Sequence, residues 1–397
     1  MLNELCLNLS FVLRLNEAYE TSGDSVRLYR VLAATDRLSY SSGLAISLLR
    51  LSNHISKLGQ HSEALPPIEE SVNICRELVA RDPGSRPNLA HSLDRLSVRL
   101  RSLGRHSEVL PPIEECVEIN RKLVEKDPAS HKPNFARSLQ ILSVTLSDLG
   151  RDSEALPAIQ ESVSLWRELI SRHPVSYKAD LAYSLHGLSF TLSKLRRHSD
   201  ALPPIQEAIS LFRELVAMHP VSYKANVASS LHNLSCVLSA LGRHSDALPP
   251  IQEAVSLRRE LVTTHPASYK ADLADSKLSL SHKLSALKRL SEALAAIQES
   301  VSIYRQLVAL YPASYSSNFA FSLHNLSCIL YDLGHYTEAL DAGKESLSLY
   351  PPLFADYPLV YVHYLRRTLW IVARILDELG KHDEASAARA EADLLST

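Results

Sequence analysis

The sequence predicts an all-α fold in which antiparallel helix pairs stack into a right-handed superhelical solenoid. The first observation is a repeat, because one leucine-containing turn recurs seven times after its first copy, six times at 46 residues and once at 45. The equivalent leucines are Leu58, Leu103, Leu149, Leu195, Leu241, Leu287, Leu333 and Leu379. The second is the composition, which is 46% hydrophobic with only 11 glycines and suits packed helices.

One unit, residues 176–220, shows how each copy makes two helices. A first apolar stripe with steps of three and four residues predicts helix A, and it contains Leu181, Leu185, Leu188, Leu192 and Leu195. Residues 196–198 form the turn. A second stripe predicts helix B, and it contains Ala201, Leu202, Ile205, Ala208, Ile209, Phe212 and Leu215. Helix B is expected to stop before Pro220, because proline cannot continue a helix.

Prolines shortly after the turn are a local conflict with this pattern. Four copies carry a pair there, at Pro66-Pro67, Pro111-Pro112, Pro203-Pro204 and Pro249-Pro250. A proline beyond the first turn removes a backbone hydrogen bond. We therefore expect helix B to start late or to kink in those copies.

The repeats predict one domain, a single solenoid of about nine copies over residues 1–397. Residues 1–36 are expected to form a degenerate first repeat, because Glu17, Ala18 and Arg30 stand 46 residues before Glu63, Ala64 and Arg76. Its helix A is expected to be cut short, because Leu2 aligns with Leu48 in the middle of the next helix A. Its stripe of Leu2, Leu5, Leu9 and Val12 is expected to leave an apolar face that needs a partner. Residues 359–397 are expected to form a C-terminal capping repeat, because the last helix B is largely charged.

These residues resemble the tetratricopeptide repeat. In one copy Leu231, Leu234, Ser235 and Leu238 match the helix A positions, Gly242 matches the glycine between the helices, and Ala247, Ile251 and Ala254 match helix B. The usual period is 34 residues, so the chain resembles a long-repeat subtype. That subtype includes kinesin-light-chain-like arrays and fungal or bacterial arrays attached to regulatory NTPases or CHAT-type proteases. HEAT repeats are the alternative architecture.

Charge and motifs argue against several functions. The formal net charge of −2 gives no field to attract nucleic acid or an anionic membrane. Five scattered cysteines and no signal peptide indicate a cytoplasmic protein. No phosphate-binding loop or paired-cysteine motif is present, so we expect no enzyme, no cofactor and no small-molecule substrate.

A metal site is the alternative for Cys236, His282 and Cys328, which occupy one position in three successive A helices. Neighbouring helices lie about 8–10 Å apart, whereas zinc ligands bind at about 2.0–2.3 Å. Three such ligands are therefore not expected to meet at one ion, and we predict no metal.

Comparison of the copies separates scaffold from candidate site. Three helix A positions vary freely, and the family resemblance implies that helix A lines the concave, partner-binding groove. The candidate residues are His91, Arg137, Tyr183, His186, Phe190, His232, Cys236, His282, Phe321, His324, Trp370 and Arg374. The Lys and Asn of the family's carboxylate clamp are absent. Unconstrained exposed positions are the alternative explanation.

A recurring helix B arginine predicts an ion-pair network between repeats rather than a binding stripe. It is found at Arg30, Arg76, Arg121, Arg167, Arg213, Arg259 and Arg305. The function expected from all these features is a protein-interaction scaffold or adaptor that binds a protein or an extended peptide. The alternative is a sensor segment of a larger signalling NTPase or CHAT protease.

Overall fold

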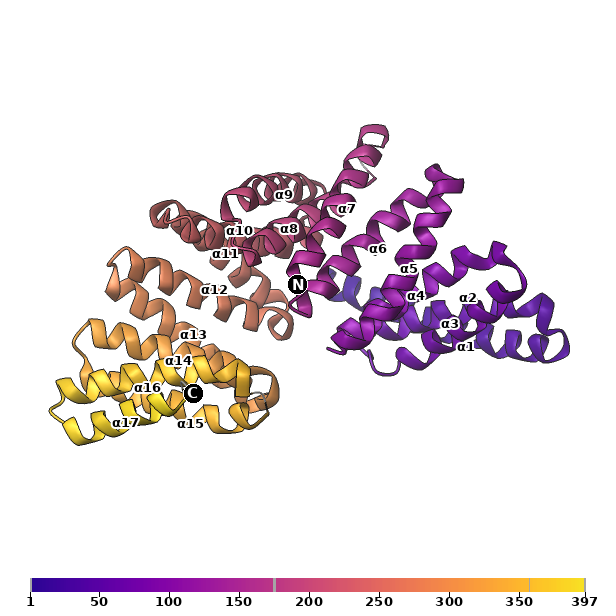
Figure 1. Cartoon of the computed structure of the whole chain (residues 1–397). Helices are drawn as coiled ribbons and strands as arrows, with labels where there is room; N and C mark the ends of the chain where they lie inside the picture. Colours follow the sequence, from indigo (N-terminus) through magenta and orange to yellow (C-terminus); the bar gives the residue numbers. More distant parts are fainter. Residues whose placement is uncertain (1, 174–175, 357, 396–397) are drawn as a thin grey trace. The chain divides into compact units, whose positions relative to one another are not determined.

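A computed structural model describes residues 2–173, 176–356 and 358–395. Within those ranges the chain has seventeen α-helices, one short 3-10 helix and no strand (Figure 1). No helix among these residues is both long and apolar enough to cross a bilayer. The predicted all-α class is confirmed.

The chain divides into two compact units, residues 1–197 and 198–397. The first unit contains α1 (Leu2–Thr35), α2 (Arg37–Lys57), α3 (Leu65–Arg81), η1 (Pro83–Ser85), α4 (Arg86–Ser102), α5 (His106–Lys126), α6 (Pro128–Asp148), α7 (Asp152–Arg172) and α8 (Lys178–Lys194). The second unit contains α9 (His198–Met218), α10 (Pro220–Ala240), α11 (His244–Thr264), α12 (Pro266–Ala286), α13 (Leu290–Leu310), α14 (Pro312–Asp332), α15 (Tyr336–Asp356), α16 (Pro358–Glu378) and α17 (His382–Leu394). Inside each unit consecutive helices pack against one another, so even-numbered helices are A and odd-numbered helices are B.

The turns of the helix pairs end on a residue in the left-handed conformation. Glycine occupies this position at Gly59, Gly104, Gly150, Gly242, Gly334 and Gly380, with φ between 71° and 82°. Glycine adopts this conformation without a steric penalty and ends helix A there. Arg196 and Lys288 adopt it without that advantage, at φ 58° and 61°. The predicted register of the turns is confirmed.

The first copy departs from the expected helix pair, because α1 is one helix of 34 residues. Leu13 stands 46 residues before Gly59, where a turn would need the left-handed conformation. That conformation costs an L-residue about 1–2 kcal/mol, so the chain continues as a helix instead. The apolar stripe expected at residues 2–12 lies outside the described side chains.

The proline prediction is correct for one helix. Helix α3 starts late, at Leu65, with Pro66 and Pro67 in its first turn. In α5, α9 and α11 the helix begins directly after the turn and continues through the prolines. Packing of the whole helix B against its two neighbours therefore outweighs the hydrogen bonds that the prolines remove.

Small residues set the close approach of the two helices in a pair. Serines of helix A donate to alanine carbonyls of helix B, with Ser235 Oγ 2.7 Å from the Ala247 oxygen and Ser327 Oγ 2.7 Å from the Ala339 oxygen. Both alanines are fully buried. A buried hydroxyl must find an acceptor, so the bond fixes the register of the pair. The equivalent Ser52 makes the same bond to the Ala64 carbonyl, whereas Ser97 and Ser281 bond within their own helices.

Candidate functional site

The A helices of neighbouring copies contact one another within each unit. In the first unit α2, α4, α6 and α8 contact one another in order, and in the second unit α10 contacts α12 and α14 contacts α16. The B helices of neighbouring copies are connected by long side chains instead. The A helices of neighbouring copies therefore lie closer together than the B helices do. This makes the A-helix face the inner side of the stack, where a groove is expected.

The connections between B helices are the predicted ion pairs, which we name the arginine ladder. Each rung joins an arginine to a glutamate in the next B helix, with N–O distances of 2.5–3.4 Å. The rungs are Arg30–Glu70, Arg76–Glu115, Arg121–Glu161, Arg213–Glu253, Arg259–Glu299 and Arg305–Glu345. The prediction of an ion-pair network is confirmed for these six arginines.

Five candidate residues lie in the first unit. His91 and Arg137 line one small cavity of about 40 Å³ beside the buried Asp94. Tyr183 and Phe190 expose 40% and 46% of their surface on α8. These two exposures are high for aromatic residues in a packed array, which favours a contact surface at α8.

His186, the fifth, lies on α8 between those two aromatic residues in the sequence and is partly buried. Burial lowers the pKa of its imidazole to about 4. His186 is therefore neutral at pH 7, and it adds an aromatic, polar surface rather than a positive charge.

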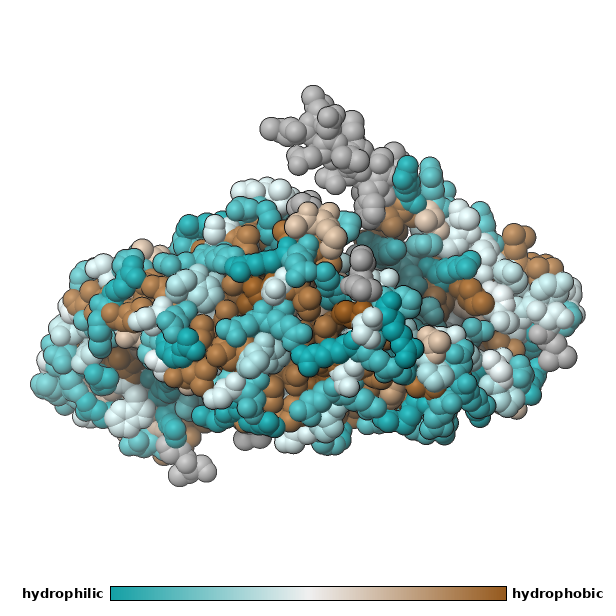
Figure 2. All heavy atoms as spheres, turned by 90° about the horizontal axis from the view of Figure 1, so that it is seen from above, coloured by the Kyte–Doolittle hydropathy of each residue, from teal (hydrophilic) through white to brown (hydrophobic). Residues whose placement is uncertain are grey.

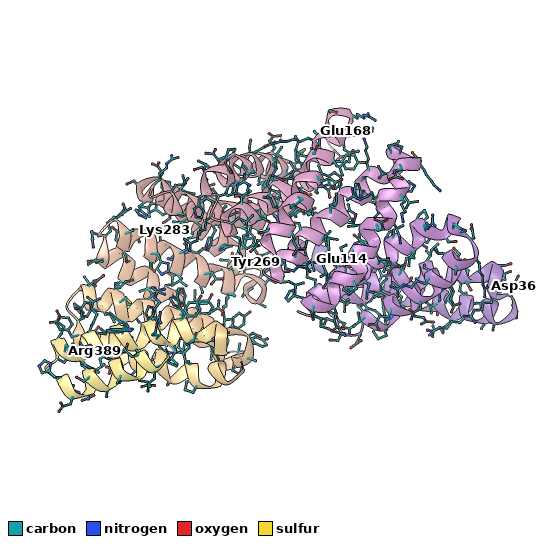
Figure 3. The ribbon with its side chains drawn as sticks, viewed as in Figure 1. Asp36, Glu114, Glu168, Tyr269, Lys283 and Arg389 are labelled. Carbon is teal, nitrogen blue, oxygen red and sulfur yellow. The ribbon has the colours of Figure 1, made fainter. Side chains whose placement is uncertain are left out.

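In the middle of the second unit one candidate residue, His232, belongs to a buried polar network. Arg258 of α11 donates through Nη1 to His232 Nδ1 at 3.2 Å and to the Asp272 carbonyl at 2.8 Å. Burial lowers the pKa of His232 to about 3, and repulsion from the charges of Arg258 and of Lys283, which is labelled in Figure 3, adds to the effect. His232 therefore accepts a hydrogen bond from the core and is not a free groove residue.

Arg258 has no counterpart elsewhere in the array. Phe212 and Tyr304, one copy before and after it, are fully buried aromatic residues. Lys277 of α12 likewise stands where other copies have the buried Leu231 and Leu323. Two adjacent copies thus each carry a buried cation where their neighbours have an apolar side chain, and Lys277 is paired with Glu299 at 2.6 Å. A lysine at a position that holds leucine in the other copies is the signal that could have identified Lys277 from sequence.

Cys236 and His282 do not converge with each other. Cys236 is exposed on α10, and its Sγ lies 4.0 Å from Ser279 Oγ. His282 Nε2 lies 2.8 Å from Asn325 Oδ1, and its ring contacts Phe321 edge to face at 6.1 Å. The residues weighed as metal ligands therefore have separate partners.

The largest cluster of candidate residues lies at the end of the second unit. His324, Trp370 and Arg374 line one cavity of about 500 Å³ between α14, α16 and α17. The remaining residues of the cavity are Cys328, Arg366, Arg367, Ile371 and Asp393. We name this cavity the arginine pocket. Trp370 is 41% exposed, whereas the other tryptophan, Trp166, is fully buried.

His324 corrects the expectation of a surface residue, because it is only 5% exposed. Its Nδ1 lies 3.1 Å from Thr368 Oγ1, and its ring stacks on Phe321 with centroids 6.4 Å apart. Burial lowers its pKa to about 4, and the charge of Arg367 adds to the effect. His324 therefore forms the neutral floor of the arginine pocket.

This architecture of paired helices is that of a helical-repeat solenoid. The tetratricopeptide repeat model matches residues 135–174, 227–267 and 322–350. These matches confirm the predicted resemblance, and the chain carries tetratricopeptide repeats at these stretches. A second model, described as anaphase-promoting complex subunit 5, matches residues 8–83, 173–231 and 263–308. The search of curated proteins found no match.

Solved structures share the fold at low sequence identity. The apo form of RapI has a TM-score of 0.57 at 13% identity, covering 88% of this chain and 97% of RapI. A signal transduction ATPase with a tetratricopeptide repeat sensor, from Pyrococcus horikoshii, has a TM-score of 0.56 at 12% identity; the match covers 95% of this chain and 52% of that protein. A putative kinesin light chain from Podosopora anserina has a TM-score of 0.40 at 19% identity, covering 54% and 94%. The fold is one that commonly serves non-enzymatic protein-interaction scaffolds.

Proposed function

We propose that this protein is a cytoplasmic scaffold or adaptor that binds a protein or an extended peptide on its A-helix face. The observation that carries the proposal is the exposure of Tyr183, Phe190 and Trp370 on A helices. Trp166 of α7 and Phe212 of α9, on B helices, are buried instead. Tyrosine, tryptophan and arginine are enriched at the residues that dominate binding energy. The chain's net charge of −2 favours a protein partner over nucleic acid or membrane.

A mixed surface of this kind fits a polypeptide better than a small apolar ligand. Figure 2 shows hydrophobic residues interleaved with hydrophilic ones over the face in view. Non-obligate protein interfaces have this mixed character, with aromatic residues and arginine enriched at the core.

Site-specific photocrosslinking tests this proposal. A photoreactive phenylalanine analogue at position 190 or 370 should crosslink a partner that co-purifies with the chain, and the same analogue at Arg213 on the arginine ladder should not. Phe190→Ala and Trp370→Ala should weaken that complex while leaving helicity and melting temperature nearly unchanged. Crosslinks that form only from position 213 would show that the B-helix face binds the partner.

A second candidate is the sensor segment of a larger signalling ATPase or of a CHAT protease. The match to the Pyrococcus horikoshii ATPase, of which this chain covers 52%, favours this candidate through shared fold alone. Sequencing the full-length transcript distinguishes the two, because the sensor function requires a nucleotide-binding or protease domain in the same open reading frame. A reading frame without either domain would leave the adaptor function.

A further inference from the structure

We infer that the arginine pocket holds an acidic, extended segment of the partner protein. This inference rests on the proposed function and specifies the chemistry of the partner. Three arginines, Arg366, Arg367 and Arg374, line the pocket against one carboxylate, that of Asp393. A cavity of about 500 Å³ is large enough for side chains of a bound peptide.

Arg367 and Arg374 differ from the arginines of the ladder, because neither has a carboxylate partner among the described residues. Every rung of the arginine ladder pairs a guanidinium with a glutamate. No carboxylate in the described part of the chain lies within ion-pair distance of Arg367 or Arg374. Both side chains are exposed, so their charges are available to an anionic ligand.

Tyr331 holds the guanidinium of Arg374 in place. The Cζ atom lies 4.7 Å from the centroid of the Tyr331 ring, and Nη2 donates to the Tyr331 hydroxyl at 3.3 Å. That hydroxyl in turn donates to Glu378 Oε1 at 3.3 Å. A cation positioned by an aromatic ring loses less side-chain entropy when it binds an anion. The guanidinium of Arg374 is thus preorganised to bind a carboxylate.

The floor of the pocket adds no negative charge. Burial and the charge of Arg367 hold the pKa of His324 at about 4, and burial raises the pKa of the Cys328 thiol to about 11. Both groups are neutral at pH 7. Asp393 is the one acidic residue among those lining the pocket, so the lining residues carry a net positive charge although the whole chain is slightly acidic.

The spacing of the arginines specifies the form of the ligand. Arg367 and Arg374 are seven residues apart on α16, or about 10 Å along its axis at about 1.5 Å per residue. An extended polyproline II segment repeats its face every three residues at about 3.1 Å each, or about 9 Å. Acidic residues at positions i and i+3 of such a segment would therefore reach both arginines, on either side of Trp370.

Fluorescence anisotropy with a labelled peptide that has Glu at every third position tests the inference. This peptide should bind the whole chain, with affinity that falls steeply as salt rises, and the matched Gln and Lys peptides should not. Tryptophan fluorescence should change on binding. The change can be assigned to Trp370, because the other tryptophan, Trp166, is fully buried. Arg367→Ala combined with Arg374→Ala should weaken binding at least about tenfold, since two charge-assisted contacts are lost.

Two further variants control for charge and for folding. Arg213→Ala removes one positive charge from the arginine ladder and should leave the affinity unchanged. Asp393→Asn removes the opposing carboxylate and should tighten binding a few-fold, an increase that damage to the fold would not produce. Circular dichroism of each variant should match that of the parent protein.

Three results of the peptide experiments would overturn the inference. They are failure of the Glu peptide to bind at millimolar concentration, equal losses from Arg213→Ala and from the pocket variants, and full competition by inorganic phosphate at the affinity of the peptide. The last would identify a small-anion site only. Crosslinking of a partner from position 370 that is insensitive to Arg367→Ala and Arg374→Ala would refute this inference and leave the proposed function standing.

Discussion

Replacing Lys277 by leucine tests whether the buried cation of α12 lowers the stability of its copy. The Lys277 side chain is 8% exposed, and its ammonium lies 2.6 Å from Glu299. Glu299 is 35% exposed and keeps Arg259 at 2.8 Å as a second partner, so the substitution leaves no unpaired carboxylate. A buried leucine contributes about 1.5–3 kcal/mol relative to an exposed one. Loss of a partly buried ion pair offsets about 1–2 kcal/mol of that.

We therefore expect Lys277→Leu to raise the free energy of unfolding by about 1 kcal/mol. Glu299→Gln, the matched variant, should lower it by about 2 kcal/mol, because it leaves the buried ammonium with a weaker partner. Urea unfolding by circular dichroism gives the totals, and native-state hydrogen exchange should locate the changes in α12 and α13. If Lys277→Leu lowers stability by more than about 1 kcal/mol, the reasoning on buried charge is wrong.

Three further predictions concern the turns, the histidines and the ladder. Arg196→Gly and Lys288→Gly should each raise stability by up to about 1 kcal/mol in thermal melts, because glycine tolerates their positive φ; a fall would show that these side chains stabilise the turn. The pKa of His324 is about 4 when folded and about 6.5 when unfolded, so the unfolded state binds more protons between these values. Stability should therefore fall as pH drops from about 6.5 to 4, and urea midpoints for His324→Asn should depend less on pH; an equal dependence would refute the assignment. Arg213→Ala should cost less than about 1 kcal/mol in low salt and still less in high salt, because Arg213 and Glu253 are about half exposed; a salt-independent loss of 2 kcal/mol or more would contradict this.

The sequence predicts the helix pairs well because the period and the turn chemistry agree. A glycine such as Gly242 stops helix A through its own backbone, and Pro220 marks the start of the next, so both signals are local. The same local logic explains α1, where Leu13 replaces the turn glycine and the expected turn is lost. The spacing of the leucines alone does not reveal the loss of this turn.

The candidate site is less predictable, because comparison of copies reveals variation and not exposure. His324 varies among copies and is nevertheless buried, since Thr368 from the next copy supplies a partner for its imidazole. Trp370 varies equally and is exposed. The two cases differ in contacts between residues more than forty positions apart, which the repeat pattern does not encode. Asp393 likewise lines the arginine pocket only because α17 packs on α16, a contact that the repeat pattern does not encode.

The arginine ladder gives some copies both halves of a connector. In α11, Glu253 receives Arg213 from the preceding B helix, and Arg259 of the same helix reaches forward to Glu299. Such copies are electrostatically interchangeable. If the gene segment that encodes one 46-residue copy were duplicated or lost, the new neighbours would again place an arginine opposite a glutamate. The number of copies could then change during evolution without a compensating substitution at each new junction.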